Sequence, residues 1–214
     1  MRFSSTKKFI YLANPKTGST SIRSLFDKCS EHHKLKSTGD FHEHWTAKQY
    51  FDVFCERGWK WNDYFKFTTV RNPWARYVSN YYYSKPDKNG NPFYVTEYEA
   101  DSAFKVSFSD WIQIWLVEKN RHPHGYVDIK TFTTDSAGNS LVDEVYRVED
   151  FDKTGLPELI ARKIVEDNVV IPKLNKSKAK NYREHYKDAD AELIAHKCKA
   201  DIDVGGYSIE ELFA

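Results

Sequence analysis

Two blocks of the chain share one order of hydrophobic patterns, in which a short apolar run is followed by a turn and then by apolar positions three or four residues apart. In the first block, residues 8–13 form an apolar run rich in β-formers, and helical spacing follows at Ile22, Leu25, Phe26 and Cys29. In the second, residues 64–70 form the run, and the helical positions are Trp74, Tyr77, Val78 and Tyr81. Each block predicts a strand, a loop and a helix.

The rest of the chain predicts further helices and one hairpin. Thr46 and Gln49 have the spacing of a capping box, which predicts a helix over 47–57. Residues 126–134 and 140–148 read as two strands joined by a loop. Additional helices are expected at 108–118, 157–167 and 188–203, with Gly205 and Gly206 ending the last one. Strands that alternate with helices predict an α/β fold of three layers, in which helices flank a mainly parallel central sheet.

Composition narrows the class of protein. The chain has 214 residues, a formal net charge of +1 and 29% charged residues, as expected for one globular domain over 1–214. Residues 84–125 begin with a turn-rich stretch and are interpreted as a variable insertion that includes the helix expected at 108–118. The balanced charge argues against a nucleic-acid partner.

The lack of targeting signals and the spacing of the cysteines predict a cytoplasmic protein. No apolar stretch reaches the length of about 18 residues that a membrane span needs, and the N-terminus lacks the pattern of a secretory signal. Cys29, Cys55 and Cys198 have neither disulfide nor metal-ligand spacing, so we expect reduced, mostly buried thiols. The aromatic stripe of Trp111, Ile114 and Trp115 has the period of a core helix.

The loop after the first strand carries candidate anion-binding chemistry. Parallel α/β sheets bind ligands beyond the carboxyl ends of their strands, and residues 14–21 lie there. Gly18 lets the backbone turn closely around a ligand, Lys16 adds a positive charge, and hydroxyl donors come from Thr17, Ser19 and Thr20. The Walker A pattern is absent, because the lysine precedes the glycine. Alone, these residues fit either an anion cradle or an ordinary helix-capping turn.

The loop after the second strand carries a matching feature. Arg71 ends that strand, and Ser79 falls on the side of the following helix away from its apolar stripe. A guanidinium with a nearby hydroxyl suits a phosphate monoester. Two such loops on two strands are a more specific signal than one.

At these loops the chain resembles the sulfotransferases that use 3′-phosphoadenosine 5′-phosphosulfate (PAPS), and it is most similar to the carbohydrate sulfotransferase branch and its bacterial relatives. Residues 15–21 resemble that family's 5′-phosphosulfate loop, and residues 70–79 resemble its 3′-phosphate motif. The segments 44–47, 146–151, 175–186 and 201–207 follow in the family's order. The resemblance implies a P-loop-like fold, PAPS as donor, 3′-phosphoadenosine 5′-phosphate (PAP) as product, and no required metal.

The resemblance also implies roles for single residues. His44 is the expected base and His42 the alternative, while Lys16 stabilises charge on the leaving group. The residues implied to hold the donor are Lys16, Thr17, Gly18, Ser19, Thr20, Ser21, Arg71, Ser79, Lys176 and Ser177. The acceptor is expected to be a saccharide hydroxyl, and residues 84–125, which follow none of the family's motifs, are the candidate acceptor-site region. The missing anchor points to a soluble bacterial or viral member.

Two other functions stay open at this point. A non-catalytic nucleotide- or RNA-binding module would use exposed rings and basic loops, but the net charge of +1 argues against it. A P-loop kinase would need the Walker lysine that this loop lacks. The oligomeric state and the position sulfated are not readable from the sequence.

Overall fold

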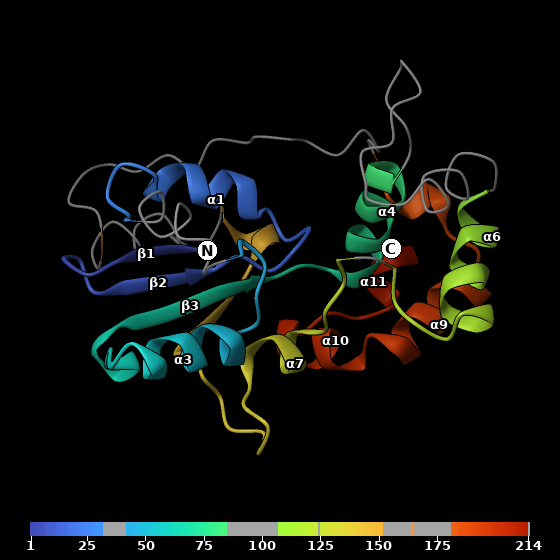
Figure 1. Cartoon of the computed structure of the whole chain (residues 1–214). Helices are drawn as coiled ribbons and strands as arrows, with labels where there is room; N and C mark the ends of the chain where they lie inside the picture. The colour runs from blue at the N-terminus through green and yellow to red at the C-terminus, as the bar shows by residue number, and fades with distance from the viewer. Residues whose placement is uncertain (32–41, 85–106, 124, 152–163, 165–180, 214) are drawn as a thin grey trace. The chain divides into compact units, whose positions relative to one another are not determined.

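The computed structural model describes residues 1–31, 42–84, 107–123, 125–151, 164 and 181–213 (Figure 1). The chain forms two compact units: unit 1 comprises Met1–Arg71 and Val127–Asn175, and unit 2 comprises Asn72–Tyr126 and Lys176–Ala214. That residues 1–214 make one domain stays a prediction. Residues 85–106 of the expected insertion, and the helix expected at 157–167 apart from Ile164, lie outside the described residues.

Unit 1 is built on a sheet to which the described residues contribute four strands, in the order β1 (Arg2–Ser4), β2 (Phe9–Leu12), β3 (Phe65–Val70) and β4 (Glu144–Arg147). β2, β3 and β4 run parallel, whereas β1 pairs antiparallel with β2. The sheet is therefore mixed. The edge strand β1 was not foreseen, because three residues are too short to show an alternating pattern.

Alternate residues of the strands bury two faces under different helices, as Figure 1 shows for α1 (Ser19–Phe26) and α3 (Ala47–Glu56). One face packs under α1, with a core of Phe9, Tyr11, Phe67, Ile22 and Phe26. The other packs under α3 and α7 (Ile129–Thr133), with a core that includes Ile10, Leu12, Tyr50, Phe54 and Phe132. Unit 1 thus has the three layers, helix, sheet and helix, that the sequence predicts.

The predicted capping box at the start of α3 is confirmed. The Thr46 hydroxyl accepts from the Gln49 amide, and the Gln49 side chain accepts from the Thr46 amide at 2.9 Å. A short 3-10 turn (Trp61–Asp63) then leads into β3.

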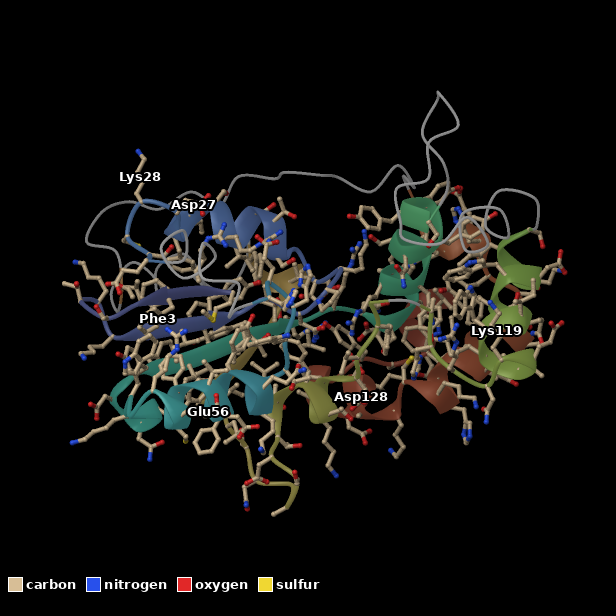
Figure 2. All side chains as sticks on the ribbon, viewed as in Figure 1. Phe3, Asp27, Lys28, Glu56, Lys119 and Asp128 are labelled. Atoms are coloured by element: carbon tan, nitrogen blue, oxygen red, sulfur yellow. The ribbon has the colours of Figure 1, made fainter. Side chains whose placement is uncertain are left out.

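The predicted strand at 126–134 is wrong, because this segment contains the helix α7. Asp128 caps it by accepting from the Thr131 amide at 2.9 Å, and Figure 2 labels Asp128 at the start of α7. The β-branched residues Ile129 and Thr133 suggested a strand, but their spacing buries them with Phe132 on one helical face. The turn at 135–139 closes on a single antiparallel bridge, Thr134 to Ser140, and β4 pairs with β3 instead. A 3-10 turn (Val148–Asp150) follows β4.

Unit 2 is helical in the described residues. Its elements are α4 (Pro73–Ser84), α6 (Phe108–Gln113) continued by a π-helical turn (Ile114–Glu118), a 3-10 turn (Arg183–His185), α9 (Asp188–Lys197), α10 (Lys199–Gly205) and α11 (Glu210–Phe213). The helix predicted over 188–203 is two helices, because Cys198 leaves helical geometry at φ −112° and ψ 25°. Gly206, at φ 60°, ends α10 as expected. No helix in the described ranges is long and apolar enough to cross a membrane.

Most apolar positions predicted for the core of unit 2 are buried, namely Trp74, Tyr77, Val78, Tyr81, Trp111 and Trp115, whereas Ile114 is half-buried. All three cysteines are free, but only Cys198 is buried, so the expectation of mostly buried thiols is wrong for the exposed Cys55. Burial raises the pKa of Cys198 to about 12, which keeps it an unreactive thiol.

A buried ion pair lies among these aromatic residues. Arg76 Nη1 lies 3.1 Å from Asp201 Oδ1, and the side chains are 1% and 0% exposed. The Arg76 guanidinium also lies 4.0 Å from the centre of the Tyr126 ring. Arg76 lies outside the apolar stripe of its helix, and its partner is 125 residues away, so local spacing gave no sign of this burial.

We expect Asp201→Asn to lower the free energy of unfolding by about 3–5 kcal/mol, because it leaves the Arg76 charge buried without its counterion. Urea denaturation measures this change. Asp203→Asn is the matched control: it breaks the exposed pair with Lys199 in the same helix and should cost no more than about 0.5 kcal/mol. Equal effects of the two variants would contradict a structural role for the buried pair.

Candidate active site

The loop between β2 and α1 is fixed by buried hydrogen bonds to the end of β3. The Thr69 hydroxyl donates to the Thr17 carbonyl at 3.0 Å, and the two hydroxyl oxygens are 2.7 Å apart. Thr17 Oγ1 also donates to the Asn14 carbonyl at 2.8 Å. The Thr17 hydroxyl, expected as a ligand donor, is therefore engaged within the protein and shapes the loop.

The start of α1 has the backbone geometry of an anion cradle. Gly18 precedes the helix in the left-handed region, at φ 72°, and supplies no side chain to cap it. The first turn holds hydroxyl residues, of which Thr20 is exposed and Ser19 and Ser21 are buried. Amide N–H groups at a helix start carry partial positive charge, so this end of α1 favours an anion.

Two cations converge on the same loop. Arg71, directly after β3, donates from Nη1 to the Lys16 carbonyl at 3.2 Å. Burial, together with the charge of Arg71, lowers the pKa of the Lys16 ammonium to about 7. Holding two like charges close together costs free energy that a bound anion would offset. Lys16, Arg71 and the start of α1 therefore fit the negatively charged end of a phosphorylated ligand.

His44 is tied to this loop through its first residue. His44 Nδ1 lies 2.7 Å from the carbonyl oxygen of Ala13, which directly follows β2. A carbonyl oxygen only accepts, so Nδ1 carries the hydrogen and the neutral ring keeps its lone pair on Nε2. Loss of water around the ring lowers the pKa of His44, and the Ala13 bond opposes that shift. The arrangement gives a neutral imidazole whose Nε2 can accept a proton near pH 7.

His42 has no comparable anchor on the loop in the described contacts. Both His42 and His44 are exposed residues, so exposure does not distinguish them, and the His42 ring lies 5.4 Å from that of Trp45. Its backbone carbonyl accepts a hydrogen bond from the Tyr50 hydroxyl. The described contacts thus tie the His44 ring, and not the His42 ring, to the loop, and the role of either as a base stays a prediction.

The structure brings together Lys16, Thr17, Gly18, Ser19, Thr20, Ser21, Arg71 and His44 in unit 1. Ser79 is half-buried on α4 and belongs to unit 2, so its role stays a prediction. Lys176 and Ser177 lie outside the described residues.

Sequence reasoning missed the residues that support this site. Thr69 holds the loop, and Val148 packs on Gly18 from the turn after β4. Arg23 forms an ion pair with Glu43, the neighbour of His44. These contacts join residues 20 to 130 positions apart, and local patterns carry no signal for them. Only Arg23 had a local signal that could have found it, because it lies one turn after Ser19 on the predicted helix.

Gly18→Ala should destabilise the protein more than the matched change Gly58→Ala. Both glycines lie near φ +70°, where alanine costs about 1–2 kcal/mol, but only at Gly18 would the new Cβ meet Val148 Cγ2, at 2.7 Å. Thermal unfolding of the two variants measures the difference. Adding Val148→Ala to Gly18→Ala should restore part of the lost thermal stability. Equal losses of stability in Gly18→Ala and Gly58→Ala would contradict the close packing of Val148 on Gly18.

Comparison with known proteins agrees with this geometry. The model of the sulfotransferase family matches residues 1–154, which include β1 to β4, the loop before α1, Arg71 and His44. Neither the curated proteins nor the solved structures contain a significant match. The match covers well over half of the 214 residues, and its range holds the cations and the imidazole described above. The chain belongs to the sulfotransferase family.

Proposed function

We propose that this protein transfers a sulfuryl group from PAPS to a hydroxyl of a carbohydrate, giving PAP and a sulfate ester. One observation carries the proposal. The loop before α1 contains Lys16, contacts Arg71 and leads into the start of α1, and the ring of His44 is hydrogen-bonded to the same loop. This combination provides positive charge for a phosphorylated donor and a base for a hydroxyl acceptor.

The residues of the loop fit the donor's 5′ end. The amides at the start of α1 would bind oxygen atoms of the 5′-phosphosulfate, and Lys16 would offset negative charge on the leaving phosphate. Arg71 would bind the 3′-phosphate, with Ser79 as the further candidate that the resemblance implies. Lys176 and Ser177 stay candidates for covering the nucleotide. When bound, PAPS supplies an activated sulfuryl group; this carries less charge than a phosphoryl group, so lysine can take the place that Mg²⁺ has in kinases.

His44 would remove the proton from the acceptor hydroxyl. Its Nε2 holds the lone pair, and the lowered pKa keeps the ring neutral near pH 7. The proposed carbohydrate acceptor rests on the resemblance to the carbohydrate sulfotransferases, and acceptor loops vary more than donor sites do.

Calorimetric titration with PAP, without added metal, tests the donor site. The wild type should bind, and Arg71→Ala should weaken binding about 30-fold or more, because it removes a charge-assisted contact worth about 2 kcal/mol. Arg57→Ala, at the C-terminal end of α3 in unit 1, is the matched loss of an arginine and should bind PAP like the wild type. His44→Ala should bind PAP but lose activity by a factor of about 10² to 10⁴. A wild type that does not bind PAP would overturn the proposal.

PAP binding above pH 7 should take up protons through Lys16. In the free protein the pKa of Lys16 is about 7, and a bound anion raises it, so the affinity should fall as the pH rises from 7 to 9. Calorimetry in buffers of different ionisation enthalpy measures the uptake; at these pH values the phosphates of PAP are already dianionic.

Lys16→Arg is the matched control, because arginine stays charged throughout this range. It should bind PAP without proton uptake. Equal uptake by both proteins would assign the proton to another group.

A further inference from the structure

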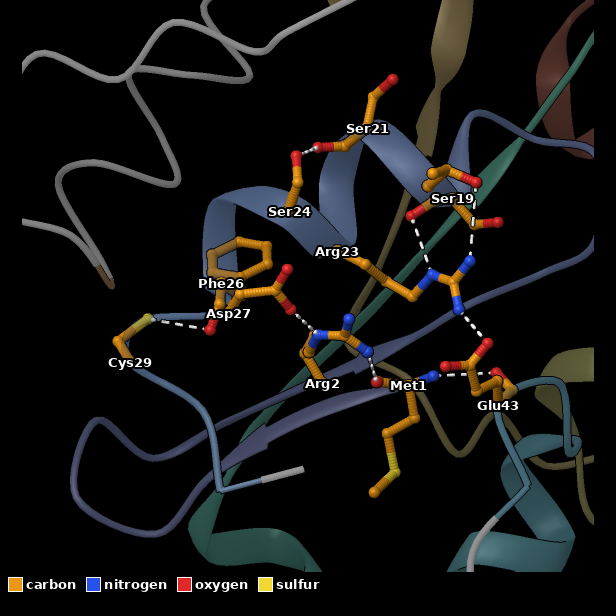
Figure 3. A network of polar contacts seen from close by, with 11 residues as sticks. Met1, Arg2, Ser19, Ser21, Arg23, Ser24, Phe26, Asp27, Cys29 and Glu43 are labelled. Carbon is orange, nitrogen blue, oxygen red and sulfur yellow. Dashed lines mark hydrogen bonds and ion pairs between the residues drawn. The ribbon is translucent and has the colours of Figure 1, made fainter. Parts of the chain in front are cut away.

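Arg23 joins the donor loop to the segment that carries His44. It lies on α1, where Nε donates to the Ser19 carbonyl at 3.3 Å, and Nη1 forms an ion pair with the Glu43 carboxylate (Figure 3). The Arg23 side chain is 14% exposed and that of Glu43 31%. This partial burial shields the pair from solvent more than an exposed surface pair.

His44 is therefore held from two sides. Its ring is bonded to Ala13 at the start of the loop, and its neighbour Glu43 is bonded to α1 at the end of the loop. The amino group of Met1 also donates to the Glu43 carbonyl at 2.8 Å. A ring held by one hydrogen bond can pivot about it, whereas a second attachment through the neighbouring residue restricts that motion.

We propose that the Arg23–Glu43 ion pair positions His44 against the donor loop, so that Nε2 faces the acceptor hydroxyl when the loop is occupied. Arg23 and Glu43 act as positioning residues, since both work through His44 and the loop. The inference rests on the proposed function. Misplacing a catalytic group by about 1 Å can cost about 10²-fold in rate, so a brace of this kind affects turnover without touching the substrate.

Charge alone predicts a different outcome from positioning. The charges that act on His44 are the Glu43 carboxylate, which raises its pKa, and the Met1 ammonium and Arg23, which lower it. Removing Arg23 and removing Glu43 should shift the pKa of His44 in opposite directions, and removing both should cancel much of the shift. A purely electrostatic pair would therefore recover activity in the double variant, and a positioning pair would not.

The test compares Arg23→Met, Glu43→Gln, the double variant and Arg23→Lys. We expect each of the first two to lower kcat about 10-fold, with the affinity for PAP within about 2-fold of wild type. The kcat of the double variant should be about equal to that of the less active single variant, and it should not return towards the wild-type value. Arg23→Lys, which keeps the charge, should retain most of kcat. Nitrogen NMR of the protein without PAP should show Nδ1–H of His44 in the wild type and a mixture of tautomers in the first two variants.

Asp27→Asn is the matched control, because it breaks the ion pair between Arg2 and the C-cap residue of the same helix. It should leave kcat and the tautomer unchanged. An unchanged tautomer in Arg23→Met and Glu43→Gln, losses that add in the double variant, or an equal loss in Asp27→Asn would overturn the inference. The NMR measurement needs no turnover, so a protein that fails to bind PAP would refute the proposed function while the contact with His44 is still tested.

Discussion

The hydrogen bond from the Thr69 hydroxyl to the Thr17 carbonyl is the contact on which the candidate site depends. It closes the loop after β2 against the last residues of β3, with both partners fully buried. The parallel register of the two strands brings Leu12 opposite Thr68, so Ala13 and Arg71 follow at the same edge of the sheet. A buried backbone carbonyl needs such a partner, and β3 supplies it from the strand that also leads to Arg71.

From this contact the electrostatics of the site follow. The closed loop brings the Lys16 carbonyl within 3.2 Å of Arg71 Nη1, and the two side-chain charges then act on each other. It also fixes the Ala13 carbonyl, which sets the hydrogen of His44 on Nδ1. Two cations and a neutral imidazole therefore depend on one backbone conformation, and Gly18, at φ 72°, permits that conformation where the helix begins.

The sequence predicted the parts of this arrangement that local patterns encode. The apolar runs gave β2 and β3 within one or two residues, and the capping box placed α3. Two local readings were incomplete for physical reasons: β1 is too short to show alternation, and β-branched residues in α7 obscured the cap at Asp128. Motif order predicted Lys16, Arg71 and His44 as members of one site, and all three residues belong to unit 1.

The contacts that orient those residues could not be predicted in the same way. The partners Thr69 with Thr17, Arg23 with Glu43 and Arg76 with Asp201 are 52, 20 and 125 positions apart. Their side chains give no periodic signal, because each contact depends on how two elements pack. Arg76 is a clear case, because a charged residue outside the apolar stripe of its helix would ordinarily be exposed, whereas Arg76 is fully buried.

The lowered pKa of Lys16 shows that the free site carries an electrostatic cost. Its pKa in the folded protein is about 7, below the ordinary 10.5, so between these values the unfolded chain binds the proton and the folded one does not. Folding stability therefore rises with pH across this window as far as Lys16 is concerned, and the full cost is present below about pH 7. An anion in the loop removes that cost because it restores a counter-charge to Lys16 and Arg71. The two cations therefore lower the folding stability of the free protein, and relief of this electrostatic repulsion adds to the affinity for a negatively charged ligand. Such a loss of stability is expected at a binding site.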